Sequence, residues 1–121
     1  MARPRILVVD DEAAQREVVI YNLEAAGFEV ICADNGEDAL LMAYEEHPDL
    51  IVLDWMMPKL SGLEVCRELR SKKETKEIPI ILLSARSEDL DKVRGLEMGA
   101  DDYVSKPYSV VELMARINTQ L

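Results

Sequence analysis

The run Leu50–Asp54, with the sequence LIVLD, consists of four apolar residues that end in an acid. Arg5–Val9 (RILVV) has the same character and is followed directly by Asp10 and Asp11. Short continuous runs of branched apolar side chains are typical of strands that are buried on both faces. We therefore expect both segments to be central strands of a parallel sheet that carries helices on each side.

Strand-like runs and segments of helical period alternate along the rest of the chain. The other expected strands are Glu29–Ala33, Pro79–Ser84 and Tyr103–Ser105. The expected helices are Ala13–Ala26, Glu37–Glu46, Leu63–Ser71, a segment from about Ser87 to Met98, and Ser109–Gln120. With right-handed crossovers, this order predicts an α/β fold with an open, doubly wound, five-stranded parallel sheet and five helices.

Local signals support several of these helices. Gly27 follows the first helix as a C-terminal stop, and Val18, Val19, Leu23 and Ala26 lie at the helical spacing expected of a buried face. Ser109, with Glu112 three residues later, has the pattern of a helix N-cap.

The chain has 121 residues and a net charge of −10, which fit one domain of acidic character. This charge argues against binding of nucleic acid or an anionic membrane by this segment, and favours a bound cation or a basic partner. Cys32 and Cys66 lack metal-ligand spacing and are expected to be small core residues in a reducing compartment. We find no signal peptide or membrane-spanning segment, so a cytoplasmic protein is expected.

Four of the five expected strands end in, or are directly followed by, polar side chains whose chemistry is suited to one site. Doubly wound sheets bind ligands beyond the carboxyl ends of the strands, where the winding direction reverses. If the first and third strands are neighbours there, three carboxylates share one small volume, and their repulsion is costly without a cation. Magnesium suits such a site because it takes few protein ligands and keeps several waters. The residues concerned are Asp10, Asp11, Asp54, Ser84 and Lys106.

Such a site would have the chemistry of phosphoryl transfer. The cation would gather phosphate oxygens, and Asp54 would act as a nucleophile toward phosphorus. Ser84 and Lys106 would donate hydrogen bonds to the new phosphoryl oxygens. Taken singly, an acid at a strand end is often only the solvated start of a loop. The combination at four strand ends is the stronger signal.

The same residues resemble the receiver domain of bacterial two-component response regulators. The resemblance covers essentially the whole chain and implies a flavodoxin-like sheet of order 2-1-3-4-5. It also implies that residues 1–121 form a receiver domain that lacks its DNA-binding effector domain. The matching motifs are Asp10-Asp11, Asp54 with Pro58 and Gly62 (DWMMPKLSG), Ser84-Ala85 and Lys106-Pro107.

The resemblance assigns a role to each site residue. Asp54 would accept a phosphoryl group from the phosphohistidine of a sensor histidine kinase, and Lys106 would pair with that group. Ser84 would move to hydrogen-bond it, and Tyr103 would turn inward behind Ser84. Mg²⁺ would be bound by Asp11, Asp54 and the backbone carbonyl of Met56, with Asp10 acting through water. The family is regulatory, and its members catalyse part of their own phosphorylation from small donors and their own dephosphorylation.

A narrower resemblance links the chain to the winged-helix transcription-factor branch, of the phosphate-regulon type. It rests on Trp55 and on residues 85–117 (ARSEDLDKVRGLEMGADDYVSKPYSVVELMARI). Active receivers of this branch form homodimers by ion pairs across the surface of the fourth helix, fifth strand and fifth helix. By position, Lys92 would face Glu112, and Asp101 or Asp102 would face Arg116. Glu97 would face a position that holds Asn118 here rather than a basic residue.

Two alternatives are open from the sequence. A standalone receiver would act by protein contact or in a phosphorelay, and its reading frame would end at Leu121 instead of continuing into a linker and a winged-helix domain. A phosphatase or hydrolase with an aspartate nucleophile fits poorly, because such enzymes usually need a second acid two residues later, where this chain has Met56.

Overall fold

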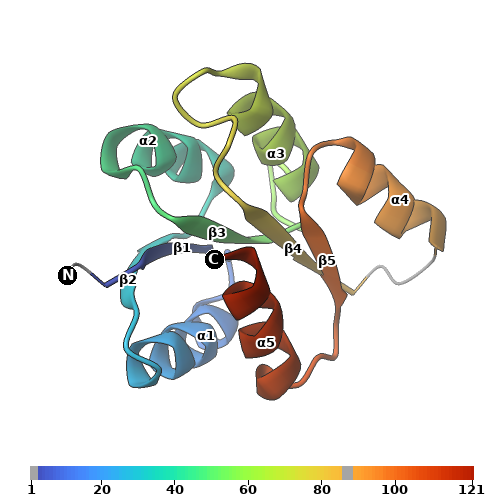
Figure 1. Ribbon diagram of the computed structural model, residues 1–121. Coiled ribbons are helices and arrows are strands. Elements are labelled where there is room, and N and C mark those ends of the chain that lie inside the picture. The colour runs from blue at the N-terminus through green and yellow to red at the C-terminus, as the bar shows by residue number, and fades with distance from the viewer. Residues whose placement is uncertain (1–2, 86–88) are drawn as a thin grey trace.

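The computed structural model describes residues 3–85 and 89–121, in which strands and helices alternate along the chain (Figure 1). The strands are β1 (Arg5–Val9), β2 (Glu29–Ala33), β3 (Leu50–Asp54), β4 (Ile80–Ser84) and β5 (Asp102–Ser105). The helices are α1 (Ala13–Ala25), α2 (Gly36–Glu46), α3 (Gly62–Ser71), α4 (Asp89–Glu97) and α5 (Val110–Gln120).

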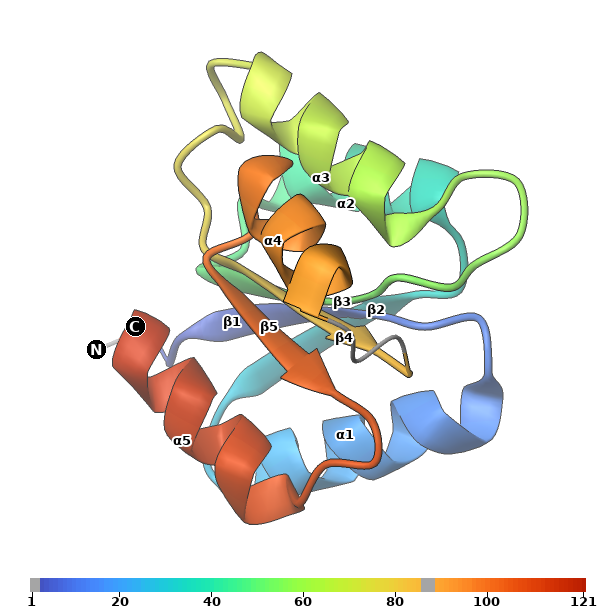
Figure 2. The ribbon, with the colours of Figure 1, turned by 90° about the vertical axis from the view of Figure 1, so that its right-hand side faces the viewer.

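The strands form one parallel sheet of order β2-β1-β3-β4-β5. Helices α1 and α5 cover one face, and α2, α3 and α4 cover the other (Figures 1 and 2). Val9 is opposite Leu53, and Leu53 is opposite Leu82, so the carboxyl ends of the three central strands lie side by side. The predicted fold class and strand order are confirmed.

The core consists of two apolar layers, one on each face of the sheet. Along β1, Leu7 and Val9 pack into the layer beneath α2 and α3, whereas Ile6 and Val8 pack into the layer beneath α1 and α5. Burial of each large aliphatic side chain contributes about 2 kcal/mol. Two-sided burial explains why the central strands are continuously apolar. All five residues of β3 are buried, including its terminal acid.

Side-chain caps begin three of the helices. Asn35, Ser61 and Ser109 accept hydrogen bonds from backbone N–H groups three residues later, with distances of 2.8, 3.3 and 3.0 Å. The cap predicted at Ser109 is thus confirmed. The expected start of the fourth helix at Ser87 lies outside the described residues. No helix in residues 3–85 and 89–121 has the length and apolarity needed to cross a membrane.

Some expectations of burial are wrong. Val18 is 54% exposed on α1, and Cys32 is exposed on β2, although Cys66 is buried as expected. β2 lies at the edge of the sheet and pairs with β1 alone, so its residues are less completely covered than those of the central strands. The edge position of β2 follows from the order of the strands in the sheet and cannot be read from the residues of β2 themselves.

Gly62 brings the start of α3 against the end of β3. A Cβ atom at this position would lie 2.4 Å from the carbonyl oxygen of Asp54 and 2.8 Å from the Cα atom of Trp55. The Gly62 N–H donates a hydrogen bond of 2.9 Å to the Trp55 carbonyl. Only glycine permits this approach of two backbone segments. The turn after Asp54 is therefore held directly by backbone contacts.

Candidate functional site

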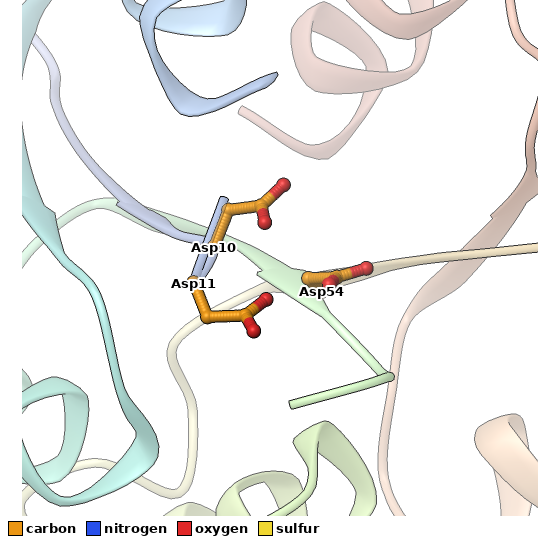
Figure 3. A group of neighbouring side chains, drawn as sticks. All are labelled: Asp10, Asp11 and Asp54. Atoms are coloured by element: carbon orange, nitrogen blue, oxygen red, sulfur yellow. The ribbon is translucent and has the colours of Figure 1, made fainter. Parts of the chain in front are cut away.

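Three carboxylates lie together at the carboxyl edge of the sheet (Figure 3). Asp10 and Asp11 follow β1, and Asp54 is the last residue of β3. Asp10 and Asp54 are each 4% exposed, whereas Asp11 is exposed. One oxygen from each carboxylate lies within 4.8 Å of the others, which is compatible with a shared cation. The predicted convergence of these three side chains is therefore present.

Lys106 reaches the same cluster from the loop after β5. Its Nζ donates hydrogen bonds to Asp54 Oδ1 at 3.0 Å and to Gln15 Oε1 at 2.8 Å. The Lys106 backbone N–H donates to the Ser84 carbonyl at 2.7 Å, which attaches the loop to the end of β4. The Lys106–Pro107 peptide bond is cis. The Lys106 ammonium group thus lies beside the Asp54 carboxylate.

Burial is the largest influence on the pKa values of the two buried acids, Asp10 and Asp54. It raises the pKa of Asp54 from 3.8 to about 6, although the hydrogen bond and charge of Lys106 act in the opposite direction. The charges of Asp10 and Asp11 act in the same direction as burial and are smaller contributions to this value. Burial also raises the pKa of Asp10, against the hydrogen bond that its Oδ1 accepts from the Glu12 N–H at 3.0 Å.

The charge on Lys106 is stabilised by its neighbours. Burial by itself would lower the pKa of Lys106, but the hydrogen bond and negative charge of Asp54, with that of Asp10, raise it overall. Lys106 is therefore positively charged, and it lies beside acids whose ionisation is made unfavourable by burial. A divalent cation held by Asp10, Asp11 and Asp54 would relieve the remaining repulsion between them.

The remaining predicted site residues lie farther along the same edge. Ser84 is completely buried at the end of β4, where it pairs in register with Ser105. Tyr103 is buried on β5, and its ring makes an edge-to-face contact with that of Trp55, with a centroid distance of 5.8 Å. The Met56 side chain is 54% exposed in the turn after Asp54. Tyr103 is therefore buried in this structure, and its movement behind Ser84 on phosphorylation stays a prediction.

Sequence reasoning missed two contributors from the first turns of α1. Gln15 accepts the second hydrogen bond of Lys106. Arg16 Nη1 donates a hydrogen bond of 2.7 Å to the Asp10 carbonyl. Both residues lie within six positions of the acidic pair in the sequence. Their roles depend on how α1 is oriented over the sheet edge, which no local pattern specifies.

The residues expected at a dimer surface lie on and beside α4, β5 and α5, away from the carboxylates, and several of them have partners within the chain. Both Asp102 oxygens accept from Arg116 Nη1 at 2.9 Å, and Glu112 Oε1 lies 3.4 Å from Arg116 Nε. Asp101 Oδ2 accepts from Arg70 Nη2 at 2.7 Å and from the Ile80 N–H at 2.8 Å. Lys92 and Glu97 are on α4.

Comparison with known proteins agrees with this geometry. The model of the response regulator receiver domain family matches residues 6–118. The chain belongs to this family. The receiver domain is 52% identical over 118 residues, 98% of its own length, to the phosphate regulon transcriptional regulatory protein PhoB of Rhizobium meliloti strain 1021. It spans 52% of that protein, or about half of its length.

Solved structures show the same fold. The chemotaxis protein CheY4 of Vibrio cholerae is 31% identical to this receiver domain, with a TM-score of 0.93 and coverage of 99% of this chain and 100% of the other. The receiver domain of the Francisella response regulator 1452 is 36% identical, with a TM-score of 0.91 and coverage of 98% and 96%. The domain is therefore a two-component response regulator receiver that is similar in sequence to a phosphate regulon regulator.

Proposed function

We propose that this receiver domain accepts a phosphoryl group on Asp54 from the phosphohistidine of a sensor histidine kinase. The main support is the position of Asp54, which is buried, hydrogen-bonded to Lys106 and within 4.8 Å of the oxygens of two other carboxylates. A buried acid surrounded in this way on a receiver fold is well placed for phosphoryl transfer. We further propose that the protein acts in the cytoplasm, where the kinase domain would meet it.

In the proposed reaction, an Asp54 oxygen forms a bond to phosphorus while the bond from phosphorus to the donor's imidazole nitrogen breaks. The imidazole leaves with the electron pair of that bond and takes up a proton. Lys106 is placed to pair with the transferred group, because its ammonium already donates to Asp54. In dephosphorylation, a water oxygen forms a bond to phosphorus while the bond from phosphorus to the Asp54 oxygen breaks, so that inorganic phosphate leaves and the carboxylate is restored.

The acidic cluster fits Mg²⁺, which would be held by Asp11, Asp54 and the Met56 carbonyl, with Asp10 acting through water. Hard oxygen ligands in small number are those that this ion prefers. When bound, Mg²⁺ would neutralise charge on the phosphoryl oxygens. The domain's own contribution is to bury the acceptor and to fix Lys106 beside it.

Phosphorylation would then change the surface formed by α4, β5 and α5. Ser84 would turn toward the phosphoryl group, Tyr103 would fill the space behind it, and two copies of the domain would associate through this surface. The similarity to a phosphate regulon regulator about twice as long supports control of a DNA-binding effector domain. In the proposed dimer, Arg116 would exchange its own Asp102 for an acid of the second copy.

The acceptor assignment is tested by labelling with ³²P acetyl phosphate in the presence of Mg²⁺. Wild-type protein should incorporate label that is released by alkali, as expected for an acyl phosphate. Asp54→Ala should incorporate none, whereas the control Glu45→Ala, which alters an exposed acid on α2, should match wild type. Full labelling of Asp54→Ala would exclude Asp54 as the acceptor.

A further inference from the structure

Gln15 lies on α1 and contacts Lys106, which follows β5. Its Oε1 accepts a hydrogen bond of 2.8 Å from Lys106 Nζ, shorter than the 3.0 Å bond from Nζ to Asp54. The two residues are 91 positions apart in the sequence, so this contact depends on the packing of α1 against the loop after β5. Gln15 is half-buried on the first turn of α1.

The chemistry of the contact fixes the orientation of the amide. An ammonium group only donates hydrogen bonds, so the carbonyl oxygen of Gln15 must face Lys106. The amide nitrogen lies 3.5 Å from Glu12 Oε2, in the direction expected for a donor that faces a carboxylate. Gln15 is therefore held between an acid at the start of its own helix and the ammonium group.

We propose that Gln15 is a positioning residue for phosphoryl transfer, which holds the Lys106 ammonium at Asp54. This inference rests on the proposed function of Asp54. The lysine side chain has four rotatable bonds and is a flexible point charge, so one acceptor alone leaves it considerable freedom. A second acceptor on a different element restricts Nζ to one place, before and after the carboxylate becomes phosphorylated. Gln15 itself touches no reacting atom.

A solvated surface glutamine would also explain a polar residue at this point of α1. The two explanations differ in their consequences for rate. A surface residue has no effect on transfer when replaced, whereas a positioning residue slows it without disturbing the carboxylates. Gln15 makes no hydrogen bond to Asp10, Asp11 or Asp54 among the contacts of the described residues. Mg²⁺ affinity should therefore separate positioning from general damage to the site.

The experiment replaces Gln15 by methionine, which has similar length and no strong acceptor. Phosphorylation by acetyl phosphate at saturating Mg²⁺ is followed by the fluorescence of Trp55, the sole tryptophan of the chain and the neighbour of Asp54. We expect Gln15→Met to lower the rate constant roughly tenfold, the effect of losing one hydrogen bond to a charged group. Gln120→Met, the same change at the chain's other glutamine, should leave the rate unchanged.

Two further readouts make the result specific. The Mg²⁺ dissociation constant, from the same fluorescence, should be unchanged in Gln15→Met, since the carboxylates keep their places. In a Lys106→Met background, which is assayed with ³²P label, Gln15→Met should have no additional effect, since the ammonium it positions is gone. A small donor has no docking surface, so a slower rate cannot reflect weaker kinase binding.

Each outcome gives a clear answer. A wild-type rate for Gln15→Met, a parallel loss of Mg²⁺ affinity, or an equal loss of rate in the Lys106→Met background would overturn the positioning role. If Asp54→Ala still takes up label, the proposed function fails instead. Uptake that depends on Asp54 but not on Gln15 would refute this inference alone.

Discussion

Asp54 combines two properties that normally oppose each other, deep burial and a reactive charge. Burial, helped by the charges of Asp10 and Asp11 and opposed by Lys106, raises its pKa to about 6. The unfolded chain would ionise this carboxyl near its ordinary value of 3.8. Asp54 therefore stabilises the metal-free fold when it is protonated and destabilises it when it is charged.

This difference predicts how the stability of the metal-free domain depends on pH. Between pH 3.8 and about 6 the folded state holds a proton that the unfolded state has released. The contribution of Asp54 is thus fully present below pH 3.8 and is lost as the pH rises through about 6. The loss amounts to at most about 3 kcal/mol in the free energy of unfolding.

Asp54→Asn should remove this contribution. Urea unfolding with a chelator, at several pH values from about 4 to about 7, should show the wild type losing stability relative to the variant. Lys106 remains protonated throughout this window and does not contribute to the difference, because its pKa is raised. Wild-type and variant stabilities that stay parallel across the window would contradict the raised pKa of Asp54.

Magnesium should stabilise the folded domain, since it binds the assembled cluster and relieves its repulsion. At about 100 times its dissociation constant, Mg²⁺ should add about 3 kcal/mol and raise the melting temperature by several degrees. Asp11→Asn should melt higher than wild type in chelator, because one repelling charge is gone, yet gain less from Mg²⁺. Identical melting curves for wild type with Mg²⁺ and with chelator would remove the metal site from the proposal.

At the scale of elements, the contact between β3 and α3 controls the geometry of the turn after Asp54. Gly62→Ala would place a methyl group 2.4 Å from a backbone carbonyl that cannot move aside easily. We expect a loss of about 3 kcal/mol in the free energy of unfolding, measured with urea. Phosphorylation by acetyl phosphate should also slow, because the backbone at Asp54 and Trp55 must shift.

Gly95→Ala is the matched comparison on α4. Its methyl group would approach the Tyr103 ring at 3.0 Å and a Leu82 methyl at 3.1 Å, which are side-chain atoms. The strain of about 1 kcal/mol is offset by a similar gain in helix propensity. Its stability should stay close to wild type. Equal losses in both variants would show that backbone crowding at Gly62 is not the cause.

The sequence predicted the order and type of all the elements and their bounds within about two residues, where the structure describes them. Strong signals made this possible, because two-sided burial leaves continuous apolar runs and caps mark helix starts. Val18 and Cys32 were misjudged because exposure at a sheet edge or on an outer helix face depends on the assembled order. Gln15 was missed because its partner lies 91 positions away in the sequence.

At the scale of the whole molecule, β5 connects the site with the expected dimer surface. Asp102 at its start pairs with Arg116 of α5, Tyr103 contacts Trp55 next to Asp54, and Lys106 directly follows its end. A rearrangement around Asp54 therefore reaches both the aromatic pair and the surface ion pairs through one strand. Because Asp102 and Arg116 already pair within the chain, the proposed dimer would exchange this ion pair for one between two copies.

Such an exchange stabilises a dimer weakly, because exposed ion pairs contribute about 1 kcal/mol or less each. The apolar residues of α4 should then dominate, since Val93 and Leu96 are 48% and 47% exposed. With beryllium fluoride as phosphoryl mimic and Mg²⁺, the domain should form dimers in sedimentation velocity experiments. Val93→Asp should abolish them, whereas Arg116→Ala should weaken them by at most about fivefold.

Leu41→Asp is the control for this prediction. Leu41 is 55% exposed on α2. This helix lies away from α4, β5 and α5 (Figure 1). The replacement of Leu41 adds the same charge to an equally exposed apolar position and should leave association unchanged. Equal effects of Leu41→Asp and Val93→Asp would attribute the loss to net charge. A wild-type domain that stays monomeric with the mimic would exclude the proposed dimer, because the mimic produces the activated state in which the surfaces of α4, β5 and α5 should associate.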